Sequence, residues 1–401
     1  MTLPNSSPSS LESPVVEDRV QPIYHARKTS FGLLACKVTL FMAILIIGGE
    51  LVSRVFWMLD RKAPFWSAKS VWYAHYPQMK TSGVEDTVIS NTDETYDILI
   101  LGGSTISEEF GSIGKQLEAG LPERLGRPVR VFNLAYAAHN SRDSMLKHRW
   151  LAHQHFDLVV IYDGINDTRM NNAPPGLFRD DYSHCTWYKH LNYLDNHPVL
   201  FQAALPFTVL YTGDRVAEAV GLVWYLPRLN PRDDWMEHGK DVRTREPFQN
   251  NLREIASMAR KKNERVVLMT FAYHIPANYS LEAFLARQLD YPPEIDYGAP
   301  VEIWGKPEHV IAALDQQNEA IRELAVQNPE AIFIDQQRLL PDSGKLYVDC
   351  CHFTKEGCTL FTQHILAALA NAKVTRGRRA RGSTSSRTSI RCFAIGDRRC
   401  G

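Results

Sequence analysis

The alternation of short apolar runs with helical stretches constrains this chain most. Five runs rich in Val, Ile and Leu are separated by longer amphipathic segments. They are Tyr96–Leu101, Val129–Leu134, Asp157–Tyr162, Val266–Phe271 and Ala331–Ile334. Continuous apolar runs with helices between them are typical of a parallel sheet covered on both faces. The pattern predicts a three-layer α/β/α sandwich around a five-stranded parallel sheet, closed by a last helix at about Thr354–Ala372.

One segment interrupts this rhythm. Residues 168–245 separate the third run from the next helix and are dense in Trp, Tyr, Pro and Leu. Such aromatics could cap a site as a lid or lie on a membrane surface, but ordinary packing onto the core is the favoured interpretation. We therefore predict one domain over residues 58–373 with an insertion at about 168–245.

The two ends of the chain lack apolar periodicity. Residues 1–30 are largely polar, and residues 374–401 form a basic tail rich in Ser and Gly, so both are predicted to be disordered. Lysine plus arginine and aspartate plus glutamate number 45 each. Because this balance of charge gives the protein no strong electrostatic field, we expect no nucleic-acid partner.

An apolar stretch near the N-terminus predicts a membrane-spanning helix over residues 31–57. Gly32–Gly49 is interrupted only by Lys37, which can reach the membrane interface, and Trp57 suits the opposite interface. A buried amphipathic helix and a cleaved signal peptide are the alternatives. Positive charges are balanced on both sides, but a single N-terminal anchor commonly tethers a secreted domain, so we expect a single-pass membrane protein with an extracytoplasmic domain.

Chemistry is expected in the loops that follow the strands, where ligands of open parallel sheets bind. In the first such loop, Leu101–Thr105 (LGGST), two glycines allow a sharp turn that leaves Ser104 at the start of the following helix. Its N–H would then face developing negative charge. Capping of that helix is the alternative role. The motif matches neither a dinucleotide site nor a P-loop, so nucleotide binding is disfavoured.

Two further loops carry candidate donors. Asp163–Asp167 (DGIND) follows the third run, and the side-chain amide of Asn166 can donate to an oxyanion. Asn133–Ser141 (NLAYAAHNS) follows the second run, and Ala138 can donate its backbone N–H. An ordinary turn explains either loop equally well.

The last loop, Asp349–Gly357 (DCCHFTKEG), places an Asp three residues before His352. In a tight loop the carboxylate can support an imidazole that takes the proton of Ser104 as general base. No cofactor is needed for such chemistry. The seven cysteines lack paired C-x-x-C spacing, and His148, His153 and His155 lack HExxH spacing, so we expect no metal site.

Together these four loops resemble the conserved blocks of SGNH/GDSL hydrolases, in order and rough spacing, over about Tyr96–Ala372. The resemblance implies a flavodoxin-like fold and ester chemistry. It also implies a catalytic triad and an oxyanion hole. The triad would consist of Ser104 as nucleophile, His352 as base and Asp349 as the acid, and the oxyanion hole of the Ser104 N–H, the Ala138 N–H and the Asn166 side chain.

Two positions depart from the pattern of that family. The usual G-D-S is G-G-S here, and Ala138 occupies the place of the usual oxyanion glycine. A backbone donor needs only its N–H, so Ala serves unless the loop demands a positive φ, where a Cβ costs about 1 kcal/mol or more. A donor lost through that strain would make activity modest.

These features predict a membrane-anchored serine hydrolase, an esterase or carbohydrate O-deacetylase, that acts on a small-molecule or glycan acyl ester. Two alternatives stay open from the sequence. One is an O-acyltransferase of a cell-surface glycan, in which a sugar hydroxyl replaces water. The other is a non-catalytic domain of the same fold that only binds its ligand.

Overall fold

The structure is a computed structural model that describes residues 31–90, 94–197, 203–222 and 233–372. The predicted disordered tails, residues 1–30 and 374–401, lie outside these ranges. The chain divides into two compact units, Met1–Leu51 and Val52–Gly401. All elements of the predicted sandwich belong to the second unit.

Helix α1 (Phe31–Arg61) carries the predicted membrane span and extends four residues beyond it. An 18-residue window of this helix has a mean hydropathy of 2.1, and none of that window is buried. A helix of this length extends about 46 Å, more than the roughly 30 Å of a bilayer core. By length and composition α1 can cross a membrane, and a signal sequence near an N-terminus has the same character.

The central sheet contains five parallel strands in the order β2-β1-β3-β4-β5. The strands are β1 (Tyr96–Gly102), β2 (Val129–Asn133), β3 (Leu158–Tyr162), β4 (Arg265–Met269) and β5 (Ile332–Ile334). The predicted five-stranded parallel sheet is thus confirmed. This order is the flavodoxin-like one, in which the chain reverses direction across the sheet between β1 and β3. Ligands of such sheets bind beyond the carboxyl ends of these two strands.

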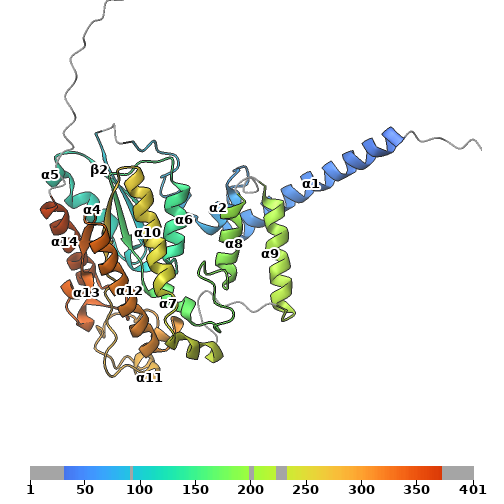
Figure 1. The fold of residues 1–401 in the computed structure, drawn as a ribbon. Helices are drawn as coiled ribbons and strands as arrows, with labels where there is room; N and C mark the ends of the chain where they lie inside the picture. The colour runs from blue at the N-terminus through green and yellow to red at the C-terminus, as the bar shows by residue number, and fades with distance from the viewer. Residues whose placement is uncertain (1–30, 91–93, 198–202, 223–232, 373–401) are drawn as a thin grey trace, which may run out of the picture. The chain divides into compact units, whose positions relative to one another are not determined.

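Helices cover both faces of the sheet, as predicted for three layers (Figure 1). Because side chains alternate along a strand, Leu99 and Leu101 of β1 join one core cluster, and Ile98 and Ile100 join the other. The first cluster also includes side chains of α6 (Ser141–Trp150) and α10 (Arg245–Lys261). The second cluster includes side chains of α4 (Ile113–Gly120) and α14 (Lys355–Asn371). Helix α12 (Pro307–Gln327) contributes side chains to both clusters.

Shorter elements connect these layers. Two of them, α2 (Ser70–His75) and α3 (Gln78–Thr81), precede the sheet and were not predicted. The other short α-helices are α5 (Pro122–Leu125), α7 (Ile165–Thr168), α11 (Leu281–Leu285) and α13 (Gln336–Leu339). The 3-10 helices are η1 (Ser104–Ile106), η2 (Arg169–Asn171), η4 (Asp233–Lys240), η5 (Val301–Ile303) and η6 (Gly344–Leu346).

The described part of the insertion is largely helical, with α8 (Thr186–Asn196) and α9 (Ala204–Ala219) as its longest elements. Several of its large side chains are buried in the same cluster as Leu99 and Leu101. They include Tyr182, Tyr188, Leu191, Phe207 and Trp235. Packing onto the core therefore accounts for many of its aromatic residues.

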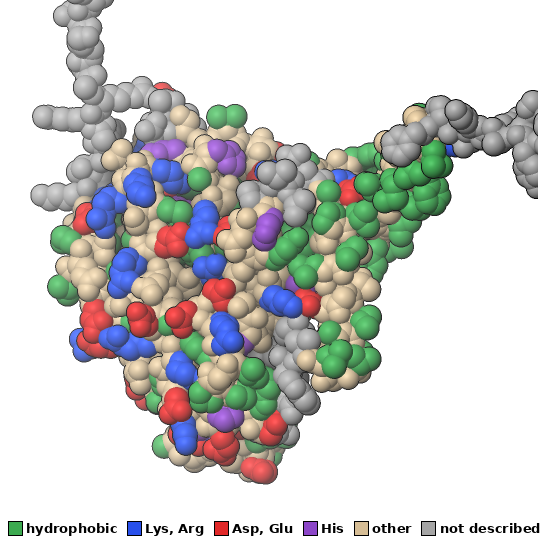
Figure 2. Space-filling view, turned by 45° about the vertical axis from the view of Figure 1, so that its right-hand side comes forward, with side chains coloured by type: hydrophobic (Ala, Val, Ile, Leu, Met, Phe, Trp, Pro, Cys, Tyr) green, Lys and Arg blue, Asp and Glu red, His purple; other side chains and the backbone are tan. Residues whose placement is uncertain are grey.

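Charged side chains of both signs are interspersed over the face of the molecule in Figure 2. This distribution matches the equal numbers of basic and acidic residues in the sequence. No single-sign patch dominates the face in view.

Candidate active site

The carboxyl end of β1 brings two glycines against β3. A Cβ on Gly102 would lie 2.5 Å from the backbone oxygen of Tyr162, and one on Gly103 would lie 2.8 Å from Asn166 Nδ2. Both distances are far inside van der Waals contact. Gly103, the departure from the usual G-D-S, thus leaves room for the Asn166 amide against the backbone that precedes Ser104.

Ser104 lies at the start of a helix, as predicted, but that helix is short. It begins the one-turn helix η1, and α4 starts only at Ile113. The turn closes because the backbone N–H and hydroxyl of Ser107 both donate to the Ser104 carbonyl, at 3.0 and 2.9 Å. The loop that follows places the Phe110 ring in a stack on His352, with centroids 4.8 Å apart.

Ser104, His352 and Asp349 form a continuous hydrogen-bonded chain. Ser104 Oγ lies 2.7 Å from His352 Nε2, and His352 Nδ1 lies 2.7 Å from Asp349 Oδ2. The three residues are 6%, 7% and 0% exposed. In the active tautomer, Nδ1–H donates to the carboxylate and Nε2 accepts from the serine hydroxyl, which is the arrangement a general base requires.

The Asp349 carboxylate is held by backbone donors from two loops. Oδ1 accepts the N–H groups of Cys351 and His352 at 2.9 and 2.8 Å, and Oδ2 accepts that of Ala299 at 2.8 Å. Burial raises the pKa of Asp349, but His352 and these N–H donors outweigh it, so the pKa lies below its ordinary value of 3.8. The carboxylate is therefore charged at neutral pH.

The same carboxylate sets the basicity of the imidazole. Burial lowers the pKa of His352, whereas Cys351 and Asp349 raise it, and the net result lies above the ordinary 6.5. Burial also holds the pKa of the Cys351 thiol well above 9, so this thiol is uncharged near neutral pH. The Asp349 charge is thus what stabilises the imidazolium.

Asp349, Cys351 and His352 also bring ligand-type atoms within 4.8 Å of one another. A metal would need the thiolate, which burial disfavours here. It would also compete with the N–H donors that already occupy the carboxylate. The donor set fits a proton-transfer chain better than a metal centre.

The predicted oxyanion donors lie on three loops, those that follow β1, β2 and β3. Within the described ranges, the backbone N–H groups of Ser104 and Ala138 have no acceptor. Ala138 has a φ of 62°, in the left-handed region that is costly for a residue with a Cβ. Asn166 Nδ2 donates one proton to the His139 carbonyl at 2.8 Å, and its second proton remains for a ligand.

One segment contacts both Asp349 and Asn166, and it was not predicted from the sequence. It runs from Gly298 to Trp304. Ala299 N–H binds Asp349, and Trp304 Nε1 donates to Asn166 Oδ1 at 2.9 Å. A Cβ on Gly298 would lie 2.0 Å from Asp349 Oδ2, so glycine is required there. No motif marks this segment; its only signal is its place after β4, at the same sheet edge as the other loops.

A Ser-His-Asp chain at the carboxyl edge of a parallel α/β sheet is an arrangement typical of acyl hydrolases. The sequence matches the model of the GDSL-like lipase/acylhydrolase family over residues 100–360. The chain belongs to this family, and the protein is an ester hydrolase of the SGNH/GDSL type.

Two solved structures show a distant similarity to this chain. A GDSL-like lipase from Bacteroides thetaiotaomicron is 12% identical, with a TM-score of 0.39, and the match covers 74% of this chain and 99% of that one. The acetylxylan esterase Axe2 from Geobacillus stearothermophilus is 17% identical, with a TM-score of 0.35 and coverages of 70% and 95%. A search of curated protein sequences found no match.

The contact between Trp304 and Asn166 generates a prediction. Trp304→Phe removes the indole N–H that restrains the Asn166 amide, so we expect kcat to fall about tenfold with little change in KM. In an Asn166→Ala background, where kcat is already reduced about a hundred- to a thousandfold, the same change should have no further effect. Steady-state kinetics of the four proteins measure this coupling.

Trp57→Phe is the matched control, because Trp57 is equally buried and its indole donates to Thr208 Oγ1 at 2.8 Å. It should leave kcat unchanged. Additive effects of Trp304→Phe and Asn166→Ala would show that Trp304 does not act through Asn166.

Proposed function

We propose that the protein hydrolyses an acyl ester through covalent catalysis by Ser104. The observation that carries the proposal is the pair of 2.7 Å contacts that links Ser104 Oγ through His352 to Asp349. The family match supports ester hydrolysis, and the geometry supports these three residues as its machinery.

In the first half-reaction, Ser104 Oγ attacks the ester carbonyl carbon while His352 Nε2 accepts the hydroxyl proton. The carbonyl π electrons move to the oxygen, which becomes a tetrahedral oxyanion. When the oxyanion collapses, the bond to the alcohol oxygen breaks, and the imidazolium gives its proton to that oxygen. The alcohol leaves, and the acyl group remains on Ser104.

In the second half-reaction, water attacks the acyl-enzyme carbonyl and gives one proton to His352 Nε2. Collapse of this second oxyanion breaks the bond to Ser104 Oγ, which takes the proton back from the imidazolium. The carboxylic acid leaves, and the starting hydrogen-bonded chain is restored. Asp349 stays ionised throughout, because its role is to orient and stabilise the imidazolium.

The oxyanion in both steps would be bound by three donors. These are the N–H groups of Ser104 and Ala138 and the second amide proton of Asn166. The positive φ of Ala138 costs about 1 kcal/mol or more, yet the residue retains its N–H as a donor. The Trp304 contact would keep the amide nitrogen of Asn166, rather than its oxygen, toward the substrate.

We further propose that α1 anchors the protein in a membrane, with the catalytic unit outside the cytoplasm. The length and apolar character of α1 support the anchor. Orientation follows from the common use of one N-terminal anchor to tether a secreted domain.

Ser104→Ala and His352→Ala should each abolish turnover of p-nitrophenyl acetate by the full-length protein in detergent. Loss of the nucleophile or of its base typically costs about 10⁴- to 10⁶-fold. A fluorophosphonate probe should label the unchanged protein, and Ser104→Ala should not be labelled. Transfer of the acyl group to an added sugar in preference to water would favour the acyltransferase alternative. Folded protein that neither turns over esters nor reacts with the probe would be a binding domain only.

The pH dependence of kcat/KM provides a second test. Only neutral His352 can accept a proton, so activity should rise with pH through the pKa of His352, which lies above 6.5. Asp349→Asn removes the charge that raises this pKa, so its activity limb should move to lower pH while kcat falls by about 10⁴-fold. An unchanged limb in Asp349→Asn would show that the carboxylate does not set the pKa of the base.

Membrane orientation can be tested by labelling Val326→Cys, a residue of α12 that is 82% exposed. The background should carry Cys36→Ser, Cys392→Ser and Cys400→Ser, which removes the exposed thiol of α1 and the thiols outside the described ranges. We expect a membrane-impermeant maleimide to label Val326→Cys in intact cells. Labelling only after the cells are permeabilised would place the catalytic unit in the cytoplasm.

A further inference from the structure

The loop that carries the Ala138 N–H contains a strained turn. The backbone N–H of His139 donates to the Tyr136 carbonyl at 3.2 Å, which closes a four-residue turn with Ala138 at its third position. A positive φ at that position ordinarily belongs to glycine, because a Cβ there crowds the backbone. The surrounding structure must therefore hold this strained turn, Tyr136–His139, in its conformation.

A buried lysine contacts the loop on both sides of Ala138. Lys147 lies in the second turn of α6, the helix that begins directly after the loop, and it is 0% exposed. Helix side chains lean toward the helix N-terminus, so this long side chain reaches back to the loop. Its Nζ lies 2.6 Å from the Leu134 carbonyl oxygen and 3.0 Å from His139 Nδ1. The ammonium group thus joins the start of the loop to the last residue of the strained turn.

The chemistry of the groups fixes the direction of these two hydrogen bonds. An ammonium group has three N–H donors and no acceptor, so Lys147 donates both to the Leu134 carbonyl and to His139 Nδ1. His139 Nδ1 then carries no proton, and the ring proton lies on Nε2. Because the lysine is buried, water does not compete for these bonds, and its removal would leave two buried acceptors without this donor.

His139 also connects the strained turn to a second oxyanion donor. Its carbonyl accepts from Asn166 Nδ2 at 2.8 Å. The same carbonyl lies close to Gly103, where a Cβ would come within 3.1 Å of it. A shift of His139 would thus move the Ala138 N–H and the Asn166 amide together. Lys147 holds the one residue that is bonded to Ala138 along the chain and to Asn166 across it.

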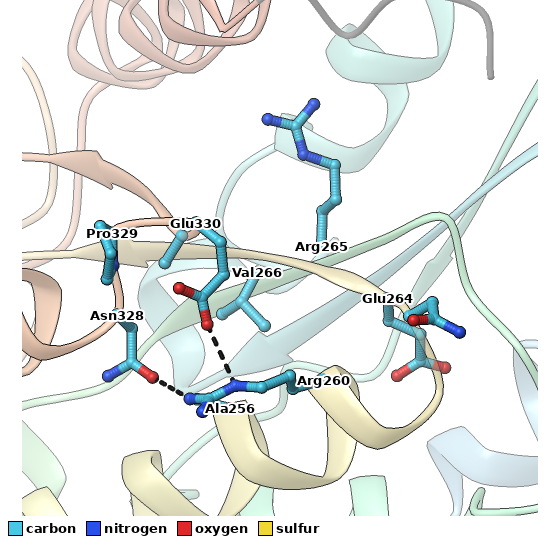
Figure 3. A pocket seen from close by; sticks show the side chains of 10 residues that line it. Ala256, Arg260, Glu264, Arg265, Val266, Asn328, Pro329 and Glu330 are labelled. Carbon is cyan, nitrogen blue, oxygen red and sulfur yellow. Dashed lines mark hydrogen bonds and ion pairs between the residues drawn. The ribbon is translucent and has the colours of Figure 1, made fainter. Parts of the chain in front are cut away.

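A second lysine makes similar contacts at the opposite edge of the sheet. Lys262 Nζ donates to the Gln154 carbonyl at 3.1 Å, and it lies 5.9 Å from an aromatic ring centroid, as Lys147 does at 5.8 Å. Lys262 also pairs with Glu264, which lines a cavity of about 520 Å³ at the amino ends of β4 and β5 (Figure 3). Because the candidate active site lies at the carboxyl ends of the strands, Lys262 is a matched control for Lys147.

We propose that Lys147 is a positioning residue, which holds the strained turn so that the Ala138 N–H and the Asn166 amide meet the oxyanion. This inference rests on the proposed function of Ser104. Lys147 acts through His139 and not on the reacting atoms. Because the oxyanion forms only during the reaction, the lysine stabilises the transition state and not the bound ester.

Lys147→Met nearly keeps the length of the side chain and removes the donor. We expect kcat for p-nitrophenyl acetate to fall about tenfold to a hundredfold in the full-length protein in detergent, with KM unchanged within about twofold. The loss is smaller than the roughly hundred- to thousandfold cost of a missing oxyanion donor, because the N–H groups are still present. Lys262→Met should leave both kcat and KM unchanged.

Ala138→Gly separates positioning from a general effect on folding. Glycine adopts a positive φ without cost, so in the Lys147→Met background this change should raise kcat about fivefold. In the unchanged protein the lysine already holds the turn, so we expect a smaller gain there. A defect unrelated to the turn would give the same gain in both backgrounds. Thermal unfolding of each variant checks that the protein is folded.

Lys147→Met also removes a charge that interacts with the buried Asp163, so a second variant tests the same contact from the loop. His139→Leu removes Nδ1 and keeps the carbonyl that binds Asn166. It should lower kcat by a similar factor, and Lys147→Met should add little to its effect.

Three results would overturn this inference while Ser104-dependent turnover of p-nitrophenyl acetate by the unchanged protein persists. They are full kcat in folded Lys147→Met, equal gains from Ala138→Gly in both backgrounds, and failure of both Lys147→Met and His139→Leu to fold, which would make the contact a structural one. Absence of Ser104-dependent turnover would instead overturn the proposed function, and the inference with it.

Discussion

The buried carboxylate of Asp349 is the group on which the rest of the site depends. A charge at 0% exposure survives only where donors replace water, and here three backbone N–H groups and an imidazole do so. Two of those N–H groups belong to the loop of His352 itself, and the third comes from Ala299. The carboxylate thus determines both the direction in which the imidazole points and its basicity.

The site also depends on the close approach of β1 and β3. These strands are the neighbours at which the sheet changes direction, so the loops after them diverge and leave a crevice. Gly102 and Gly103 let the backbone of one loop lie against Tyr162 and Asn166 of the other. A chain with the usual acidic residue at position 103 would need a different placement of the Asn166 amide.

The sheet could be predicted from the sequence because burial on both faces demands uninterrupted apolar strands, which leave a strong local signal. The position of Ser104, Asn166 and His352 at the carboxyl edge of the sheet could be predicted because each closely follows a strand or precedes the last helix. Ala299 and Trp304 could not, since a backbone donor can belong to any residue and one tryptophan resembles the many that pack in the core. The positive φ of Ala138 likewise depends on the loop around it, not on its own identity.

The segment from Gly298 to Trp304 links the proposed activity to the completion of folding. Asp349 and Asn166 lie 183 positions apart in the sequence, and this one segment contacts both. Closing such long loops is slow relative to forming local helices. The arrangement proposed for catalysis therefore exists only once the chain is nearly fully folded. On the proposed mechanism, partly folded forms on the way to the native state carry Ser104 without His352 and Asp349 beside it and are inert toward esters.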